Sequence, residues 1–182
     1  MTYATESILA HCTAQCRIAS PLGTMLLART RAGLAGAWFE KQKHHPDAID
    51  APERADDPLL VATASQLRAY FAGESDAFDV PLDLQGTAFQ RDVWQALLRI
   101  ESGRTRSYGD IARELGVPSA SRAVGSAVGR NPVSIIVPCH RVVGSSGALT
   151  GYAGGLDRKT SLLRIEADRA RPRRGLRELE LH

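Results

Sequence analysis

The stretch Ser107–Val143, SYGDIARELGVPSASRAVGSAVGRNPVSIIVPCHRVV, predicts how the second half of the chain is organised. Ser107 is a good N-cap for a short helix, and Gly116-Val117-Pro118 ends that helix in a tight turn. Ser119 is expected to cap a second helix. The apolar faces of the two helices are Tyr108, Ile111, Ala112 and Leu115, then Ala120, Ala123, Val124 and Ala127. Two short helices with such a turn form either a helix-turn-helix or an ordinary helical hairpin.

The outer face of the second helix carries Arg122 and Ser126, which are four residues apart. In a helix-turn-helix protein this is where the recognition helix meets DNA. Arg130-Asn131-Pro132 is expected to end the helix. The apolar run 134–137 that follows is expected to be a buried strand, which leads directly to Cys139.

Pro138-Cys139-His140-Arg141 sets a single thiol beside an imidazole at the end of that strand. The neighbouring imidazole and the positive charge of Arg141 favour the thiolate, which is the nucleophilic form of cysteine. A buried structural cysteine is the alternative, because free cysteine is among the most buried residue types. The flanking residues favour the reactive cysteine.

The last helix is expected at residues 157–166, where Leu162, Leu163 and Glu166 share one face. A carboxylate on an inward face needs a partner, and His140 is the obvious candidate. Cys139, His140 and Glu166 would then form a set of nucleophile, base and orienting group. The alternative, a solvated Glu166 at a frayed helix end, stays open at this point.

The first half of the chain is expected to be an α/β unit. Residues 22–28 and 34–39 are predicted strands of a hairpin, and the polar segment 41–58 is a predicted surface loop. A helix over 60–71 is expected to stop at Gly73, and residues 75–86 are expected to link the two halves. Thr87 is a good N-cap for a further helix with Phe89, Val93, Ala96, Leu97 and Ile100 on one face.

Charge is distributed unequally along the chain. Residues 1–85 carry 7 Lys/Arg and 11 Asp/Glu, whereas residues 86–182 carry 16 and 9. A basic half that contains the reactive-looking cysteine indicates a polyanionic partner, nucleic acid above all. Part of the excess lies in an arginine-rich tail, residues 169–182, which is equally typical of a solvated chain end.

Composition also limits the class of protein. No long uncharged apolar segment or signal region is present, so we expect a cytoplasmic protein without membrane contact. Three cysteines are too few for a disulfide framework. His11, Cys12, Cys16, His44 and His45 match no common zinc spacing, so no metal is expected.

An ordered set of motifs over the second half resembles the O6-alkylguanine-DNA alkyltransferase family, also called methylated-DNA–protein-cysteine methyltransferases. The motifs are Phe89 with Trp94, Ser107–Ala112, Ser121–Gly125, Asn131-Pro132, Pro138–Val143, Gly147, Gly151–Leu156, Lys159, and Leu162-Leu163 to Glu166. The first half matches more loosely, through Ser20–Gly23 and Gly33-Leu34.

The resemblance implies a ribonuclease-H-like α/β domain at 1–85 and a mainly helical domain with a helix-turn-helix, winged-helix-like, at 86–168. It implies DNA repair by direct reversal. The alkyl group of O6-alkylguanine, and less efficiently of O4-alkylthymine, would pass from duplex DNA to Cys139. The resulting thioether has no easy exit, so each molecule would act once. No cofactor is needed for this single displacement.

The resemblance also implies individual roles. The Cys139 proton would pass through a water molecule to His140, which Glu166 orients, and Tyr108 would protonate the leaving guanine. Asn131 would hold the turn before the active-site strand. The remaining residues expected to bind substrate or DNA are Val142 through its carbonyl, Ala153 through its N–H, the loop residues Tyr152 and Gly154, Ser145 at a phosphate, and Arg122.

Arg122 would enter the base stack in place of a flipped nucleotide, because a base inside a duplex cannot reach such a pocket. The partner is double-stranded DNA, and the protein is expected to be monomeric in solution with possible cooperative assembly on DNA. Three other interpretations remain: a damage sensor without transfer, a helix-turn-helix regulator, and a cysteine hydrolase. Each of them explains only one or two of the motifs.

Overall fold

Three antiparallel strands, β1 (Ala14–Ile18), β2 (Met25–Arg29) and β3 (Leu34–Phe39), open the fold in a computed structural model that describes residues 10–171. The predicted hairpin is confirmed as β2–β3. The strand predicted from residue 22 begins only at Met25, because residues 20–23 turn: the Gly23 N–H bonds to the Ser20 carbonyl and Gly23 has φ +111°. β1 was not predicted.

The sheet is buried on both faces. Met25, Leu27 and Phe39 pack into the main core together with α2 (Pro58–Phe71), while Leu26 and Trp38 face a second cluster. The segment between β3 and α2 covers that second cluster and inserts Ile49 into it. Successive strand residues point to opposite faces, so burial on both faces explains why these strands are apolar throughout.

The helix boundaries follow local capping signals. Asp57 caps α2 through the N–H groups of Leu59 and Leu60, and α2 ends before Gly73, which has φ +70° as a helix stop requires. Thr87 caps α3 (Ala88–Leu98) and forms a capping box with Gln90, as its sequence position predicts. The linker between α2 and α3 runs beside β3, where Leu34 pairs with Leu82.

The second part of the chain contains the remaining elements: β4 (Arg106–Ser107), α4 (Tyr108–Glu114), α5 (Ser121–Gly129), the 3-10 helix η1 (Cys139–Arg141), β5 (Val142–Val143) and α6 (Leu156–Ala170). Ser107 caps α4 as predicted, in a capping box with Asp110. Helix α5 packs against both α3 and α4. The short strands β4 and β5 pair in parallel and were not predicted.

The prediction for α5 needs two corrections. Ser119 does not cap the helix; Ala120 is its N-cap residue and provides no side-chain hydrogen bond. The buried face consists of Val124, Ala127 and Val128, whereas Ala123 is exposed. Arg122 and Ser126 are both exposed, as predicted.

The predicted strand at 134–137 is wrong. The chain turns there, because the Val137 N–H bonds to the Val133 carbonyl at 3.0 Å and Ile135 has φ +74°. A β-branched residue rarely adopts this left-handed conformation. The turn lies against β3 of the N-terminal sheet, through hydrogen bonds from Ala37 N–H to the Pro132 carbonyl and from Ser134 N–H to the Ala37 carbonyl. Cys139 therefore begins a 3-10 turn instead of ending a strand.

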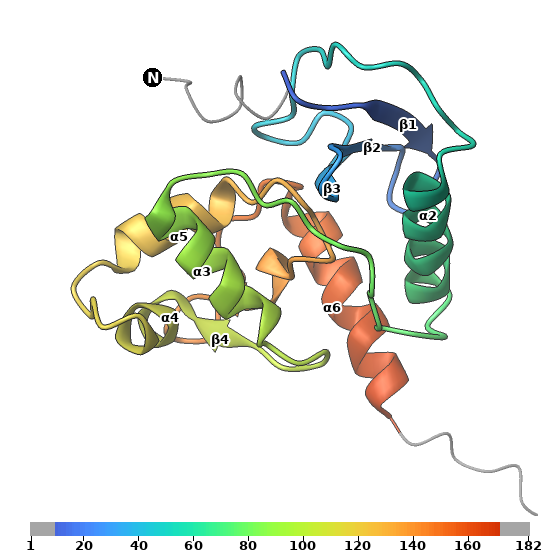
Figure 1. The fold of residues 1–182 in the computed structure, drawn as a ribbon. Coiled ribbons are helices and arrows are strands. Elements are labelled where there is room, and N and C mark those ends of the chain that lie inside the picture. The colour runs from blue at the N-terminus through green and yellow to red at the C-terminus, as the bar shows by residue number, and fades with distance from the viewer. Residues whose placement is uncertain (1–9, 172–182) are drawn as a thin grey trace, which may run out of the picture.

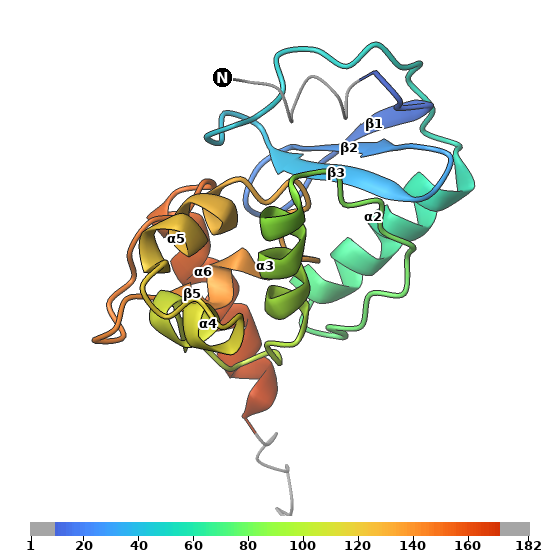
Figure 2. The same ribbon diagram turned by 60° about the vertical axis from the view of Figure 1, so that its left-hand side comes forward.

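Helix α6 is longer than the predicted 157–166 and reaches Ala170. In the view of Figure 1 it lies between α2 on one side and the group of α3, α4 and α5 on the other, and in the turned view of Figure 2 it runs behind α4 and α5. Glu166 is therefore inside the helix and fully buried, which excludes the frayed end. The predicted tail lies outside the described residues from 172 onward, while Arg169 and Ala170 belong to α6. None of the described helices is long and apolar enough to cross a membrane.

Candidate active site

Cys139 lines a pocket of about 410 Å³ between the two parts of the molecule. The thiol is almost completely buried, so a reacting group must enter this pocket to reach it. The lining residues are Lys43, His44, Tyr108, Gly125, Ser126, Val128, Gly129, Arg130, Cys139, Gly151, Tyr152 and Ala153. The pocket thus combines one side of α5, the loop before α6 and a segment of the N-terminal half.

The side chain of Asn131 holds the backbone around the thiol. Its Nδ2 donates to the Val137 carbonyl at 2.8 Å and to Cys139 Sγ at 3.1 Å, and its Oδ1 accepts the Val133 N–H at 2.9 Å. The amide therefore fixes the turn and also points a donor at the sulfur. A donor at that position favours the thiolate once it forms.

Burial raises the pKa of Cys139 to about 11, although the Asn131 hydrogen bond and the charge of Lys159 both oppose this rise. The expectation that the flanking residues favour the thiolate is therefore wrong for the free protein. A thiol of this kind stays protonated at neutral pH and needs a base to become a nucleophile.

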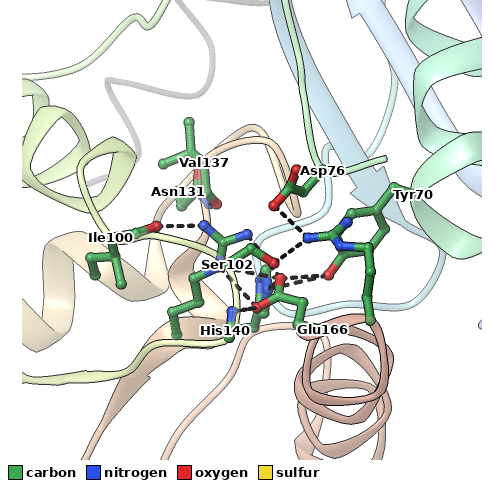
Figure 3. Close-up of polar contacts among 11 residues, drawn as sticks. Tyr70, Asp76, Ile100, Ser102, Asn131, Val137, His140 and Glu166 are labelled. Atoms are coloured by element: carbon green, nitrogen blue, oxygen red, sulfur yellow. Dashed lines mark hydrogen bonds and ion pairs between the residues drawn. The ribbon is translucent and has the colours of Figure 1, made fainter. Parts of the chain in front are cut away.

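His140 and Glu166 form a buried pair that provides such a base. His140 Nε2 lies 2.7 Å from Glu166 Oε1, and both side chains have no exposed area (Figure 3). Burial lowers the pKa of His140 despite the opposing effect of Glu166, so the imidazole is neutral near pH 7. Its Nδ1 is buried and has no hydrogen-bond partner among residues 10–171. A neutral imidazole whose Nε2–H is held by a carboxylate offers Nδ1 as a proton acceptor.

Arg141 does not serve the thiol, which corrects the sequence interpretation. Its guanidinium binds Glu166 at 3.0 Å from Nε to Oε2 and at 2.9 Å from Nη2 to Oε1, and it also donates to the Ile100 carbonyl. Burial alone would raise the pKa of Glu166, but the hydrogen bonds from His140 and Arg141 hold it well below its usual range. Glu166 is therefore an ionised carboxylate.

Tyr70 also reaches this carboxylate, and sequence reasoning missed it. Its hydroxyl donates to Glu166 Oε1 at 2.7 Å and lies 3.4 Å from His140 Nε2 (Figure 3). Tyr70 belongs to α2, far from the motifs of the second half. Its position three residues after Leu67, on the apolar face of α2, signals burial, but nothing in the local sequence indicates its partner.

Lys159 is a second missed residue. It is fully buried, and its Nζ donates to the carbonyls of Val142 at 2.5 Å, Thr150 at 2.8 Å and Gly151 at 3.3 Å. Burial lowers its pKa to about 8. The signal in the sequence was the spacing of Lys159, Leu162 and Glu166, which puts the lysine on the same inward face.

The residues predicted for base binding gather around the pocket. The Tyr108 hydroxyl donates to the Thr150 carbonyl at 3.2 Å, and burial raises its pKa. Tyr152 and Ala153 line the pocket, and the Ala153 carbonyl accepts the Lys43 N–H at 2.9 Å. Position 154 requires glycine, because a Cβ there would lie 2.5 Å from the Tyr152 ring.

Arg122, Ser145 and Val142 lie outside the pocket lining. Arg122 is exposed in the first turn of α5, and Ser145 is exposed in the turn after β5. The Val142 carbonyl is bound by Lys159. Two cationic residues that sequence reasoning did not assign to the site, Lys43 and Arg130, line the pocket instead, together with His44, whose pKa is lowered by burial and by the charges of Arg130 and Lys43. Within residues 10–171, no three His, Cys, Asp or Glu side chains gather in a way that could hold a metal ion.

Two family models match the chain. The ribonuclease-like domain of 6-O-methylguanine DNA methyltransferase matches residues 17–84, and the DNA binding domain of the same family matches residues 88–168. A methylated-DNA–protein-cysteine methyltransferase of Mycobacterium bovis is 50% identical over 153 residues, which are 84% of this chain and 92% of the relative. One of Methanosarcina acetivorans is 50% identical over 149 residues, with 81% and 94% covered.

Solved structures agree with these relatives. Mycobacterium tuberculosis OGT in complex with DNA has a TM-score of 0.80 and 48% identity, and the match covers 87% of this chain and 95% of that one. The O6-methylguanine DNA methyltransferase of Methanococcus jannaschii has a TM-score of 0.61 and 28% identity, with 83% and 92% covered.

Proposed function

Because the chain belongs to the 6-O-methylguanine DNA methyltransferase family, it repairs alkylated DNA by direct reversal in a suicide alkyl transfer, and we propose that Cys139 is the residue that accepts the alkyl group. One observation carries the assignment. Cys139 is a thiol that both lines a pocket and follows directly on a buried turn, with the neutral base His140 next to it. Cys12 and Cys16 do not line this pocket.

The chemical step begins with a proton transfer. Cys139 gives its proton, through a bridging water molecule, to Nδ1 of His140, and the ionised Glu166 stabilises the imidazolium that forms. Asn131 and Lys159 stabilise the thiolate. The thiolate attacks the alkyl carbon, a carbon–sulfur bond forms, and the bond from carbon to guanine O6 breaks with its electron pair left on guanine.

Protonation of the base completes the transfer. Tyr108 is the proton donor in this proposal, because it lines the pocket and burial keeps its hydroxyl protonated. The N–H of Ala153 serves O6, and Tyr152 and Gly154 shape the loop that closes on the base. The carbonyls of Cys139 and Val142 read the exocyclic amine in this proposal, and the Val142 carbonyl uses for it the lone pair that Lys159 does not occupy. The proton held by the His140 imidazolium then passes through solvent to the Tyr108 phenolate, which restores both side chains, so the net products are guanine and a Cys139 thioether.

DNA approaches over α4 and α5, which act as the helix-turn-helix of this proposal, winged-helix-like in its surroundings. Arg122 projects from the first turn of α5, where it can take the place of the flipped base, and Ser145 contacts a phosphate. The cationic residues Lys43 and Arg130 add positive charge at the pocket. O4-alkylthymine is the weaker substrate in this proposal. Residues 1–85 and 86–168 form the two domains. The protein acts as a monomer in the cytoplasm, with possible cooperative assembly on DNA.

The test is a duplex that contains one O6-methylguanine, followed by intact-mass measurement and peptide mapping. Cys139 should gain one methyl group in place of a hydrogen, and the gain should saturate at one per molecule. Cys139→Ala should bind the duplex without transfer. Cys16→Ala, which removes another buried thiol, is the matched control and should react like the parent protein. Methylation of Cys139→Ala would contradict the assignment.

A further inference from the structure

The hydroxyl of Tyr70 crosses from the N-terminal half of the chain to the carboxylate that holds the base. The residue is fully buried near the end of α2, and its ring packs against Phe71 and Phe78 with centroid distances of 5.7 and 5.8 Å. This packing fixes the ring, so the hydroxyl has little freedom to turn away. It donates to Glu166 Oε1 at 2.7 Å, the oxygen that also lies 2.7 Å from His140 Nε2.

The phenol is a permanent donor at this position. Burial and the neighbouring Glu166 carboxylate raise the pKa of Tyr70 far above its usual range. The second carboxylate oxygen, Oε2, accepts the Gly103 N–H at 3.1 Å and Arg141 Nε at 3.0 Å. Arg141 also donates to Oε1, from Nη2 at 2.9 Å, and Tyr70 acts on this oxygen, which faces the imidazole.

A second contact from the N-terminal half lies one turn further along α6. Asp76, which follows α2, forms an ion pair with Arg169, and Arg169 also donates to the Ser102 hydroxyl at 2.5 Å (Figure 3). Glu166 and Arg169 are three residues apart and so lie on one side of α6. The segment around α2 thus contacts α6 at two neighbouring points.

We propose that the N-terminal half of the chain positions the His140–Glu166 pair for alkyl transfer, through Tyr70 on Glu166 and Asp76 on Arg169. The inference rests on the proposed function of Cys139 and deepens it. Tyr70 is a positioning residue: it touches neither the thiol nor the pocket lining, and it acts through Glu166. The N-terminal domain then contributes to the chemical step as well as to folding.

The expected effect on proton transfer has a definite sign. A donor on Glu166 Oε1 withdraws negative charge from the oxygen that holds His140, so its removal raises the pKa of His140. Protonated His140 cannot accept the Cys139 proton. The fall of the transfer rate at acidic pH, which is the acid limb of the pH–rate profile, therefore moves to higher pH. The charged and titratable groups around His140 are Tyr70 from α2, Lys159 and Glu166 from α6, and Cys139 and Arg141 from η1.

The experiment is the single-turnover rate of methyl transfer at saturating DNA, measured from pH 5 to 9 in Tyr70→Phe. We expect a rate about tenfold lower, the usual scale for one hydrogen bond to a charged group, with the acid limb displaced upward and unchanged DNA affinity. The ring nitrogen shifts of His140 in NMR spectra should report the raised pKa directly. Asp76→Asn, at a half-exposed position, removes the second contact without removing a donor from Glu166, so it should lower the rate less than Tyr70→Phe and leave the acid limb in place.

Thr63→Val is the matched control, because it removes another buried hydroxyl of α2, one that donates only to the Leu59 carbonyl. It should leave the rate and the acid limb unchanged. A Tyr70→Phe profile that coincides with the parent profile overturns the inference, as does a loss of rate without movement of the limb. Absence of methyl transfer to Cys139 in the parent protein would instead refute the proposed function, so the two failures are distinguishable.

Discussion

Two buried cations, Arg141 and Lys159, lie near the proposed catalytic pair of His140 and Glu166, and their partners differ in kind. Arg141 binds the ionised carboxylate of Glu166 with two of its nitrogens. Lys159 binds only carbonyl oxygens, those of Val142, Thr150 and Gly151. The charge of Arg141 is neutralised in the resting protein, whereas that of Lys159 is not.

This difference in partners distinguishes Arg141, a cation that stabilises the fold, from Lys159, a cation whose charge is available to stabilise an anion in the reaction. A buried charge without a charged partner is costly, and the cost falls when an opposite charge appears nearby. The thiolate of Cys139 is such a charge, since Lys159 and Cys139 influence each other's pKa in the directions expected of an attractive pair. We infer that Arg141 stabilises the fold around Glu166, while Lys159 stabilises an anion that exists only during alkyl transfer.

Removal of the structural cation should have the largest effect. Arg141→Met leaves the buried Glu166 carboxylate without the guanidinium that binds both of its oxygens and should lower the free energy of unfolding by about 3–5 kcal/mol. Urea denaturation at pH 7.5 measures the change. Lys159→Met, which strands only neutral carbonyls, should lower it by about 1–3 kcal/mol. Equal losses in the two variants would remove the distinction between the cations.

Loss of Lys159, the cation available to the thiolate, should affect the rate of methyl transfer more than the free energy of unfolding. Lys159→Met deprives the Cys139 thiolate of a neighbouring positive charge and so raises the pKa of the thiol. One unit of pKa lowers the thiolate fraction tenfold, so the single-turnover rate near pH 7.5 should fall about tenfold. Arg164→Met, which removes an exposed cation from the same helix, is the control and should react at the parent rate. A Lys159→Met rate equal to that of the control would show that Lys159 only holds the loop.

The sequence predicts those features whose causes are local. Thr87 and Ser107 cap their helices through hydrogen bonds that span three residues, so the helix starts are readable from a few neighbouring side chains. The motif around Cys139 likewise points to it as the proposed nucleophile, and the inward spacing of Glu166 predicts the carboxylate that pairs with His140. These signals need no knowledge of the rest of the fold.

The failures concern contacts between distant segments. Ser134–Val137 has the composition of a strand, but backbone bonds to β3 and the Asn131 side chain bend it into a turn. Arg141 lies two residues after Cys139 in sequence, yet it points to Glu166 on α6. Tyr70 lies 96 residues from its partner Glu166. Tertiary packing decides each of these, and no periodicity reports it.

The smallest predicted effect is the part of the pH dependence of the unfolding free energy that arises from Lys159. Its pKa is about 8 in the folded protein and near 10.5 in the unfolded chain. Between these two pKa values the unfolded chain binds more protons than the folded protein, so the free energy of unfolding rises with pH. Below pH 8 Lys159 is charged in both states, and the full cost of burying its charge remains.

The difference in unfolding free energy between the parent protein and Lys159→Met should therefore increase from pH 7 to pH 10, by about 1 kcal/mol after allowance for solvent screening at the pocket. Cys139 titrates in both proteins, and repeating the pair in a Cys139→Ala background removes its contribution. Denaturant titrations at four pH values are sufficient. A difference in unfolding free energy that does not change with pH would mean that the hydrogen bonds to the three carbonyls compensate fully for the burial of the Lys159 charge. Lys159 would then be as well neutralised as Arg141, and the contrast between the two cations would be lost.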